Sequence, residues 1–290
     1  MLKTRLLYGT ILVLALAGIL AIDHFTNTIY GFTALLFIIA ALALYEFYTM
    51  HEVKLQTKLP KIYGIITGLL IIIGVILESR DGLANFVDLI FIFSFIVSLG
   101  LLCLMVWYVA KGMPSSINNA YIIISGIIYI VFPLLVLYFI RTIMAFDDPF
   151  GERLVLYLII INKVADTAAY FGGTYLGRHK LAPTVSPNKS AEGLTCALVA
   201  GLLCGFAFWY FTGLRGSWSL SYSFIMSFII ALSGQIGDLI ESLIKRYCGV
   251  KDSAALFPAL GGVLDLIDCL LVSAPVMILF VKISSLLFIR

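Results

Sequence analysis

Carboxylates within apolar segments are the residues of this sequence best placed to do chemistry. Asp238 and Glu241 lie three residues apart in one apolar run, and Asp265 and Asp268 have the same spacing in the next. Residues three apart share one face of a helix, so each run would present two carboxylates together. A charge at the centre of a membrane helix costs about 2.5–3.5 kcal/mol. The pattern therefore predicts a polar site for a hard cation such as Mg²⁺, which prefers oxygen ligands.

Basic residues and glycines lie close to these acids in the sequence. Lys245, Arg246 and Lys251 follow the first acidic run, and Lys189 lies in the polar segment 186–193. Cations beside Mg²⁺ suit a triphosphate or a phospholipid head group. The pair Gly261–Gly262 precedes the second acidic run, where the N–H groups of a helix N-terminus attract anions. The alternative is structural: internal ion pairs between helices, or cations anchored at the membrane surface.

The elements that must position these residues are membrane helices. Of the 290 residues, 62% are hydrophobic and only 12% are charged, whereas a soluble domain has about 25% charged residues. The apolar residues form runs near the length of about 20 residues that spans a bilayer. We therefore predict an all-α polytopic membrane protein. Its nine expected spans cover residues 5–22, 29–48, 61–77, 87–110, 118–142, 153–175, 194–213, 220–246 and 262–288.

The two halves of the chain differ in their polar content. Residues 1–150, with about five spans, contain few ionisable groups, chiefly Glu46 and Asp88, and are interpreted as a hydrophobic scaffold. Residues 151–290, with about four spans, carry the acids already described and also Lys163 and Asp166 in the sixth span. This half is predicted to be the catalytic region, with polar loops at 176–193 and 247–261.

The distribution of Lys and Arg predicts the orientation. With the N-terminus in the cytoplasm, the cytoplasmic side holds twelve of these residues and the other side six, as the positive-inside rule favours. The C-terminus then lies outside, and the C-terminal helices form a polar cavity that faces the cytoplasm. The expected location is the inner (plasma) membrane of a cell. The net charge is only +3 and no basic stretch has interleaved aromatics, so nucleic acid is not an expected partner.

Three segments resemble the phosphatidate cytidylyltransferase (CDP-diacylglycerol synthase) family. Residues 242–268, SLIKRYCGVKDSAALFPALGGVLDLID, are similar to its C-terminal signature, S-x-x-K-R-x₄-K-D followed by P-G-H-G-G-x-x-D-R-x-D. Residues 165–193 are similar to a second block that contains S-P-x-K-[ST]-x-E-G, and residues 234–242 also fit. The order and separation of the segments agree with the family, and the first 150 residues match it only in being hydrophobic.

The resemblance implies a nucleotidyltransferase that makes CDP-diacylglycerol and pyrophosphate from CTP and phosphatidate with Mg²⁺, for phospholipid biosynthesis. It implies two metal ions, held chiefly by Asp238 and Asp265 with Asp268 and Glu241 as partners. A homodimer is also implied, although we assign no span a dimer face from its small residues. The residues expected to bind phosphates or to shape the site are Lys189, Lys245, Arg246, Lys251, Asp166, Ser186, Ser242, Asp252, Gly261 and Gly262.

Three positions depart from the family pattern and leave alternatives open. Ala259 and Leu260 stand where the family has Gly-His, and Leu266 stands in place of an Arg. These changes remove an imidazole and a guanidinium, so an inactive member or one of altered specificity is an alternative. Another is an ion-coupled transporter that uses Lys163 and Asp166. A third is a different CTP-using lipid enzyme, such as a polyprenol kinase or an archaeal-type CDP-lipid synthase.

Overall fold

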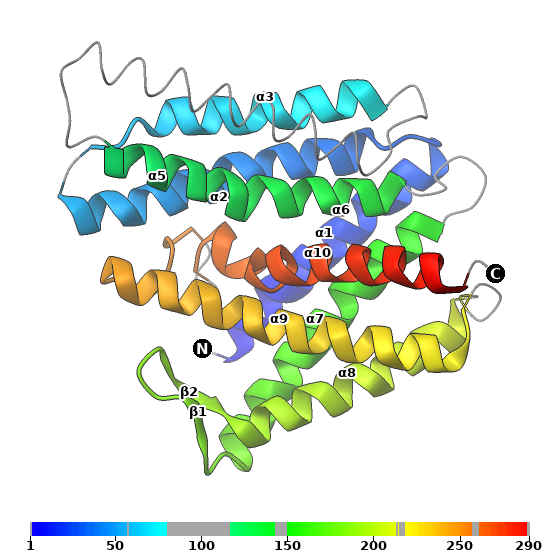
Figure 1. Ribbon diagram of the computed structural model, residues 1–290. Coiled ribbons are helices and arrows are strands. Elements are labelled where there is room, and N and C mark those ends of the chain that lie inside the picture. Colours follow the sequence, from blue (N-terminus) through cyan, green and yellow to red (C-terminus); the bar gives the residue numbers. More distant parts are fainter. Residues whose placement is uncertain are drawn as a thin grey trace. The chain divides into compact units, whose positions relative to one another are not determined.

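Helices make up most of the described chain in the computed structural model of this protein (Figure 1). The structure describes residues 2–56, 58–79, 117–142, 150–212, 214, 218–256 and 261–288. The helices in these ranges are α1 (Leu2–Phe25), α2 (Tyr30–Leu55), α3 (Lys61–Ser79), α5 (Ile117–Gly126), a π-helical turn η2 (Ile127–Val131), α6 (Phe132–Thr142), α7 (Phe150–Tyr175), α8 (Ala191–Phe211), α9 (Leu220–Cys248) and α10 (Val263–Phe288). Two strands, β1 (Lys180–Ala182) and β2 (Ser186–Ser190), precede α8.

Six helices of the described chain are long and apolar enough to cross a membrane: Tyr30–Leu55, Asn118–Thr142, Phe150–Tyr175, Ala191–Phe211, Leu220–Cys248 and Val263–Lys282. Leu14–Phe25 and Lys61–Leu77 are shorter apolar helices. The protein is therefore a helical, multi-pass membrane protein, as the sequence predicts. The predicted span 87–110 lies outside the described residues, so the total of nine spans stays a prediction.

The chain divides into two compact units, which we describe separately. The first unit contains residues 1–139 and 248–266, and the second contains residues 140–247 and 267–290. Helices α6, α9 and α10 each contribute residues to both units. The expected division of roles between residues 1–150 and 151–290 stays a prediction.

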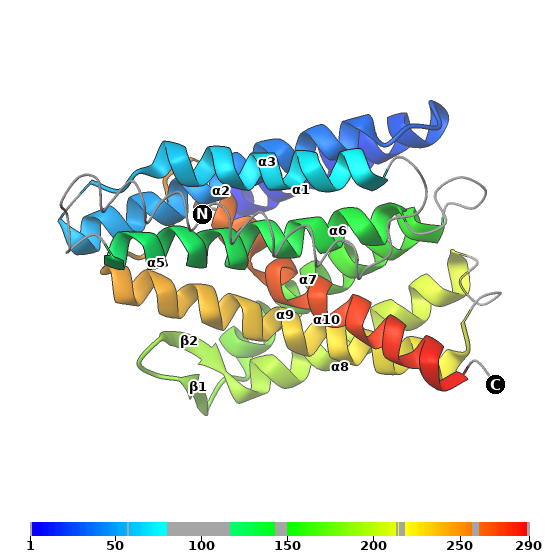
Figure 2. The same ribbon diagram turned by 45° about the horizontal axis from the view of Figure 1, so that its top comes forward.

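Helices α2, α3 and α5 pack together in the first unit (Figures 1 and 2), and Tyr48 of α2 contacts both α3 and α5. Its side chain is fully buried, and its hydroxyl donates to the carbonyl oxygen of Ile123 at 3.0 Å. A Cβ atom added to Gly64 of α3 or Gly126 of α5 would lie 2.7 Å from the Tyr48 ring. The two glycines therefore make room for the large aromatic side chain between three helices.

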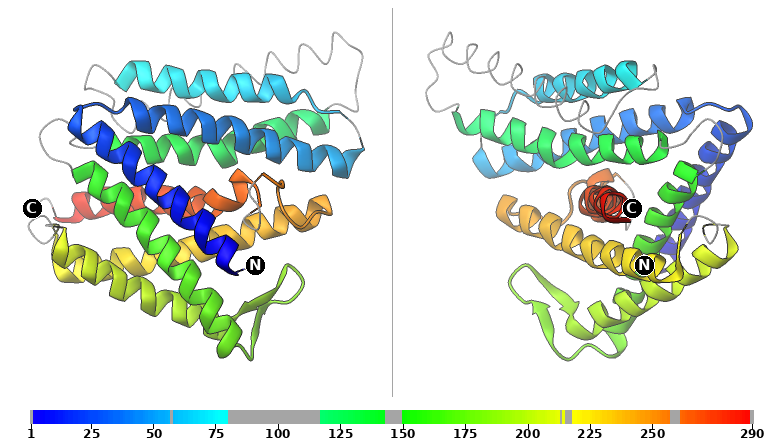
Figure 3. Two further views of the ribbon diagram at one scale, coloured as in Figure 1. Left: turned by 180° about the vertical axis from the view of Figure 1, so that it is seen from behind. Right: turned by 45° about the vertical axis from the view of Figure 1, so that its right-hand side comes forward.

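Small residues bring α8 close to its neighbours in the second unit, where α7 and α8 pack against each other (Figure 3). Gly201 and Gly205 lie four residues apart on α8 and face α9. A Cβ added to Gly201 would lie 2.8 Å from Ala231 Cβ, and one added to Gly205 would lie 1.8 Å from Ser227 Oγ. Such small-residue contacts let membrane helices approach closely. This G-x-x-x-G face, which we did not single out in the sequence, is therefore covered within the chain.

A short hairpin lies in the segment 176–193, which the sequence indicated only as a polar loop (Figure 3). Strands β1 and β2 are antiparallel, and Lys180 pairs with Ser190. The Ser190 hydroxyl then caps α8 by accepting from the Gly193 N–H at 3.1 Å. Glu192 in the first turn of α8 accepts from the backbone N–H groups of Arg178 and His179. These contacts fix the hairpin to the start of α8.

Candidate active site

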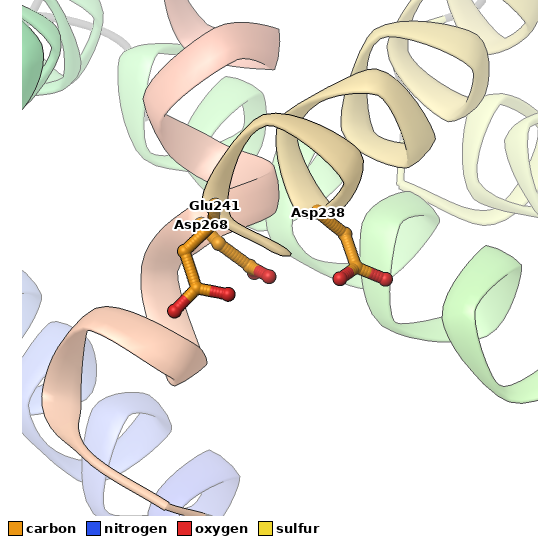
Figure 4. A group of neighbouring side chains, drawn as sticks. All are labelled: Asp238, Glu241 and Asp268. Carbon is orange, nitrogen blue, oxygen red and sulfur yellow. The ribbon is translucent and has the colours of Figure 1, made fainter. Parts of the chain in front are cut away.

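Three carboxylates of the second unit lie together at α9 and α10 (Figure 4). Asp238 and Glu241 come from α9 and Asp268 comes from α10, and one oxygen of each lies within 4.8 Å of the others. Glu241 and Asp268 are buried, whereas the Asp238 side chain is 34% exposed. Among the described residues, this is the group with the spacing and the donor atoms to hold a metal ion. Three carboxylates fit a hard divalent cation, because such ions take oxygen ligands and complete their shell with water or phosphate.

Gly237 allows this group to form. A Cβ added at Gly237 would lie 2.5 Å from the Asp268 carbonyl oxygen and 3.2 Å from Cys269 Cα. Any larger residue would therefore meet the backbone of α10. The glycine lets α9 and α10 approach at the level of the acids, so that Asp268 lies beside Asp238 and Glu241.

Lysines neutralise the group from two sides. Lys189 Nζ of β2 lies 2.7 Å from Asp238 Oδ2, and Lys245 Nζ forms an ion pair with Glu241 one turn along α9. Ser242 Oγ makes a long contact of 3.5 Å to Asp238 Oδ1. Three of the four acids predicted to bind metal, and two of the cations predicted to bind phosphate, therefore occur together.

The hairpin is connected to α9 at a second point. Arg246 Nε donates to the Val185 carbonyl oxygen at 3.2 Å, between β1 and β2. With the Lys189–Asp238 pair, this bond holds the hairpin at two places on α9. Ser186 starts β2 and is half-buried, so the structure places it in the same hairpin as Lys189.

Asp166 and Lys163 of α7 form a further polar contact in the second unit. Their side chains lie 3.8 Å apart, and Gln235 Nε2 of α9 donates to Asp166 Oδ1 at 2.8 Å. Lys163 Nζ also lies 3.7 Å from the sulfur of Cys269, the residue after Asp268. We did not assign Gln235 from the sequence. We named Lys163 among the ionisable residues of the sixth span but gave it a role only in the transporter alternative.

The fourth predicted metal ligand, Asp265, belongs to the first unit, and its carboxylate accepts several hydrogen bonds there. Asp265 Oδ2 accepts from the Gly262 N–H at 2.7 Å and from the N–H and hydroxyl of Ser253 at 3.0 and 2.8 Å. Glu46 of α2 accepts from the N–H groups of Val263 and Leu264 at 2.8 and 2.9 Å. The carboxylates of Asp265 and Glu46 therefore already accept hydrogen bonds from the N–H groups that we expected to bind a phosphate.

Backbone conformation and packing explain why glycine occupies the two positions before α10. Gly261 has a φ of +89°, which glycine adopts at little cost. A Cβ at Gly262 would lie 2.2 Å from Ser253 Oγ and 2.3 Å from Glu46 Oε2. Glycine at both positions is thus explained by the fold, and their substrate-binding role stays a prediction.

The remaining predicted residues lie in the loop after α9. Lys251 and Asp252 are exposed, and their roles stay predictions. Leu266 is half-buried in the first turns of α10, whereas Ala259 and Leu260 lie outside the described residues. Near Asp265, we named Glu46 from the sequence but interpreted it as part of the scaffold, and we did not single out Ser253. An acid within an apolar run, as at Glu46, was the signal that could have marked it as more than scaffold.

Membrane helices that present grouped carboxylates with lysines beside them are what a membrane enzyme acting on phosphates would need. The sequence pattern of the cytidylyltransferase family matches residues 3–284, and the chain belongs to this family. It is therefore an enzyme of the nucleotidyltransferase class.

Several curated relatives carry the name phosphatidate cytidylyltransferase. One from Brucella suis biovar 1 (strain 1330) is 32% identical over 86% of this chain and 84% of its own length. One from Staphylococcus haemolyticus (strain JCSC1435) is 28% identical over 95% of this chain and 97% of its own. One from Haemophilus influenzae is 44% identical over a shorter part, 44% of this chain and 46% of its own.

Proposed function

We propose that this protein transfers the cytidylyl group of CTP to phosphatidate, forming CDP-diacylglycerol and pyrophosphate at the cytoplasmic face of the membrane. The observation that supports this most is the group Asp238, Glu241 and Asp268 with Lys189 and Lys245 paired to it. The name shared by the relatives supports the choice of reaction. The excess of Lys and Arg in the loops on one side supports the choice of face.

The reaction needs positioning and charge neutralisation more than a side-chain nucleophile. A phosphate oxygen of phosphatidate attacks the α-phosphorus of CTP, a new P–O–P bond forms, and the bond to pyrophosphate breaks. Negative charge accumulates on the attacking and leaving oxygens, so fixed cations stabilise the transition state. The substrate supplies the nucleophile, and no residue of the chain is covalently modified.

The carboxylates would hold Mg²⁺. Asp238, Glu241 and Asp268 have the required spacing, and Asp265 is proposed as the fourth ligand from its place in the family signature. The ions, two in our proposal, would neutralise phosphate charge and orient the oxygens that react. A buried group of acids would otherwise repel a triphosphate, so Mg²⁺ and the acids act together.

The basic residues would bind the phosphates. Lys189 and Lys245 already form ion pairs with the acids. Arg246 and Lys251 follow Lys245 in the sequence. In the proposal, Asp166 and Ser186 orient groups within the site. Asp252 supports the loop after α9, and Ser242 supports Asp238. Gly261 and Gly262 shape the turn before α10. A homodimer stays an expectation from the family resemblance.

The position of a label tests the reaction and separates it from its rivals. Purified protein is incubated with phosphatidate and CTP labelled on the α-phosphorus, with Mg²⁺ or with a chelator. We expect label in CDP-diacylglycerol only with Mg²⁺. A parallel incubation uses CTP labelled on the γ-phosphate, and transfer of that label to lipid would instead show a lipid kinase. No transfer of label from either phosphate would overturn the proposal. Ion flux in vesicles without nucleotide would support the transporter.

A further inference from the structure

Glu46, which the sequence placed in the scaffold, lies at the first turn of α10. Its side chain is 4% exposed, and its two oxygens accept from the N–H groups of Val263 and Leu264 at 2.8 and 2.9 Å. These are donors that a helix leaves without an acceptor of its own. The positive end of the helix dipole also favours a carboxylate here. Glu46 therefore fixes where α10 begins.

Ser253 connects Glu46 to Asp265. The Ser253 hydroxyl oxygen lies 2.9 Å from Glu46 Oε2 and 2.8 Å from Asp265 Oδ2. A hydroxyl has one proton, so it donates to one carboxylate at a time, and the two acids share it. A change at Glu46 therefore changes how Asp265 is held.

The space around these groups is filled. A Cβ at Gly262 would lie within 2.3 Å of both Glu46 Oε2 and Ser253 Oγ, and Ser253 is itself 7% exposed. Water cannot easily replace a lost carboxylate in such a closely packed place. The geometry at the start of α10 thus depends on Glu46 itself.

We propose that Glu46 is a positioning residue for Asp265, the carboxylate of the first unit that the proposed function assigns to the metal. It acts through Ser253 and the first turn of α10, the turn that carries Asp265. In this role it touches neither substrate nor metal. The inference rests on the proposed function, because Asp265 is a metal ligand only within that proposal.

Asp23→Asn is the matched control for Glu46→Gln. Asp23 is 2% exposed and accepts from the N–H groups of Gly31 and Phe32, both at 2.8 Å, at the start of α2. It is also a buried carboxylate at a helix N-terminus of the first unit. The start of α2 lies roughly 24 Å along the helix from Glu46, at 1.5 Å per residue. Both variants keep the side-chain shape and remove the charge.

The measurement is the Mg²⁺ dependence of two properties of folded, purified protein. One is the initial rate of CDP-diacylglycerol formation, and the other is the rise in melting temperature that Mg²⁺ produces without substrates. We expect Glu46→Gln to raise the Mg²⁺ concentration for half of each effect by about tenfold, as loss of a residue that orients a metal ligand does. We expect Asp23→Asn to lower the melting temperature and leave both Mg²⁺ midpoints unchanged.

Equal Mg²⁺ midpoints in Glu46→Gln and the wild type would overturn the inference, whatever the loss of stability. If Glu46→Gln does not fold, Ser253→Ala is the variant that tests the inference, because it removes only the hydroxyl that the two acids share. An unchanged Mg²⁺ midpoint in Ser253→Ala would then overturn the inference. A wild type that makes no CDP-lipid, with a shifted thermal midpoint in Glu46→Gln, would refute the proposed function and leave the positioning role standing.

Discussion

The two units hold their carboxylates in different ways. In the first, Glu46 and Asp265 accept hydrogen bonds from the backbone N–H groups of residues 253 and 262–264. In the second, Asp238 and Glu241 pair with Lys189 and Lys245. Backbone donors cannot move away without unwinding a turn, whereas a lysine has a long, flexible side chain. The first arrangement is suited to fixing a helix, and the second to exchanging one partner for another.

Asp268→Asn should have the largest effect on activity. It removes one charge from the group that would bind Mg²⁺, and loss of a metal worth several kcal/mol predicts a fall in kcat on the order of 10³-fold. The assay is CDP-diacylglycerol formation by purified variant and wild type. Turnover at the wild-type rate would remove Asp268 from the metal site.

Asp265→Asn sharpens the comparison between the units. We expect it to lower kcat by up to about 10³-fold as well. We also expect it to lower the melting temperature, because the hydrogen bonds from Ser253 and Gly262 lose a charged acceptor. Asp268→Asn should not lower the melting temperature, since it relieves repulsion from Asp238 and Glu241. Wild-type turnover in Asp265→Asn would leave Asp265 as a structural residue only.

Gly237→Ala tests the approach of α9 to α10. The new methyl group would lie 2.5 Å from the Asp268 carbonyl oxygen, so the backbone must shift, and a shift near 1 Å costs about 10²-fold in kcat/KM. Gly18→Ala is the control, because a Cβ there meets nothing within 4 Å. Equal activity of the two variants would show that the close approach is not needed for catalysis.

Lys189→Met tests whether the lysine at Asp238 also binds phosphate. A lost hydrogen bond between charged groups is worth about 1.5–3 kcal/mol, so KM for CTP should rise by about 10- to 100-fold. The control is Lys180→Met, which changes an exposed lysine of β1 in the same hairpin. A fall in kcat with no change in KM would assign Lys189 to a different role.

The smallest effect is expected from restoring the family residues with Leu260→His and Leu266→Arg. If the missing imidazole and guanidinium weaken nucleotide contacts, the double variant should lower KM for CTP by a few-fold, because an added contact is worth about 1 kcal/mol. Steady-state kinetics with varied CTP measures this. An unchanged or raised KM would show that this chain binds the nucleotide in another way.

The helices could be predicted well from the sequence because long apolar runs have few other structures available in a membrane. The expected segments 5–22, 29–48, 61–77, 118–142, 153–175, 194–213, 220–246 and 262–288 each correspond to helix in the structure. The ends differ by up to seven residues, the largest difference being at α2, which ends at Leu55 and not at residue 48. The hairpin was missed because its strands have only three and five residues, which is too short to show an alternating apolar pattern.

The acids of the site could be predicted in part, because spacing within one helix is visible in a sequence. Asp238 and Glu241 are such a pair, and the structure brings Asp268, predicted from its own pair with Asp265, beside them. The partner of the α10 N-terminus could not be predicted, since Glu46 lies 217 residues from Val263 and no spacing rule connects them. The close approach at Gly237 was likewise hidden, because a glycine in a helix gives no sign of what lies opposite.

The distance along the chain between Glu46 and α10 has a consequence for biosynthesis. Helix α2 is made long before α10, and at about 5–20 residues per second the 217 residues between Glu46 and Val263 take roughly 10–40 s to translate. Throughout that interval the carboxylate lacks the N–H groups that it accepts from in the finished protein. A chain that stops before residue 263 keeps an acid in an apolar helix without these donors. Completion of α10, the last helix, therefore supplies the hydrogen-bond donors for Glu46 of α2, one of the first helices.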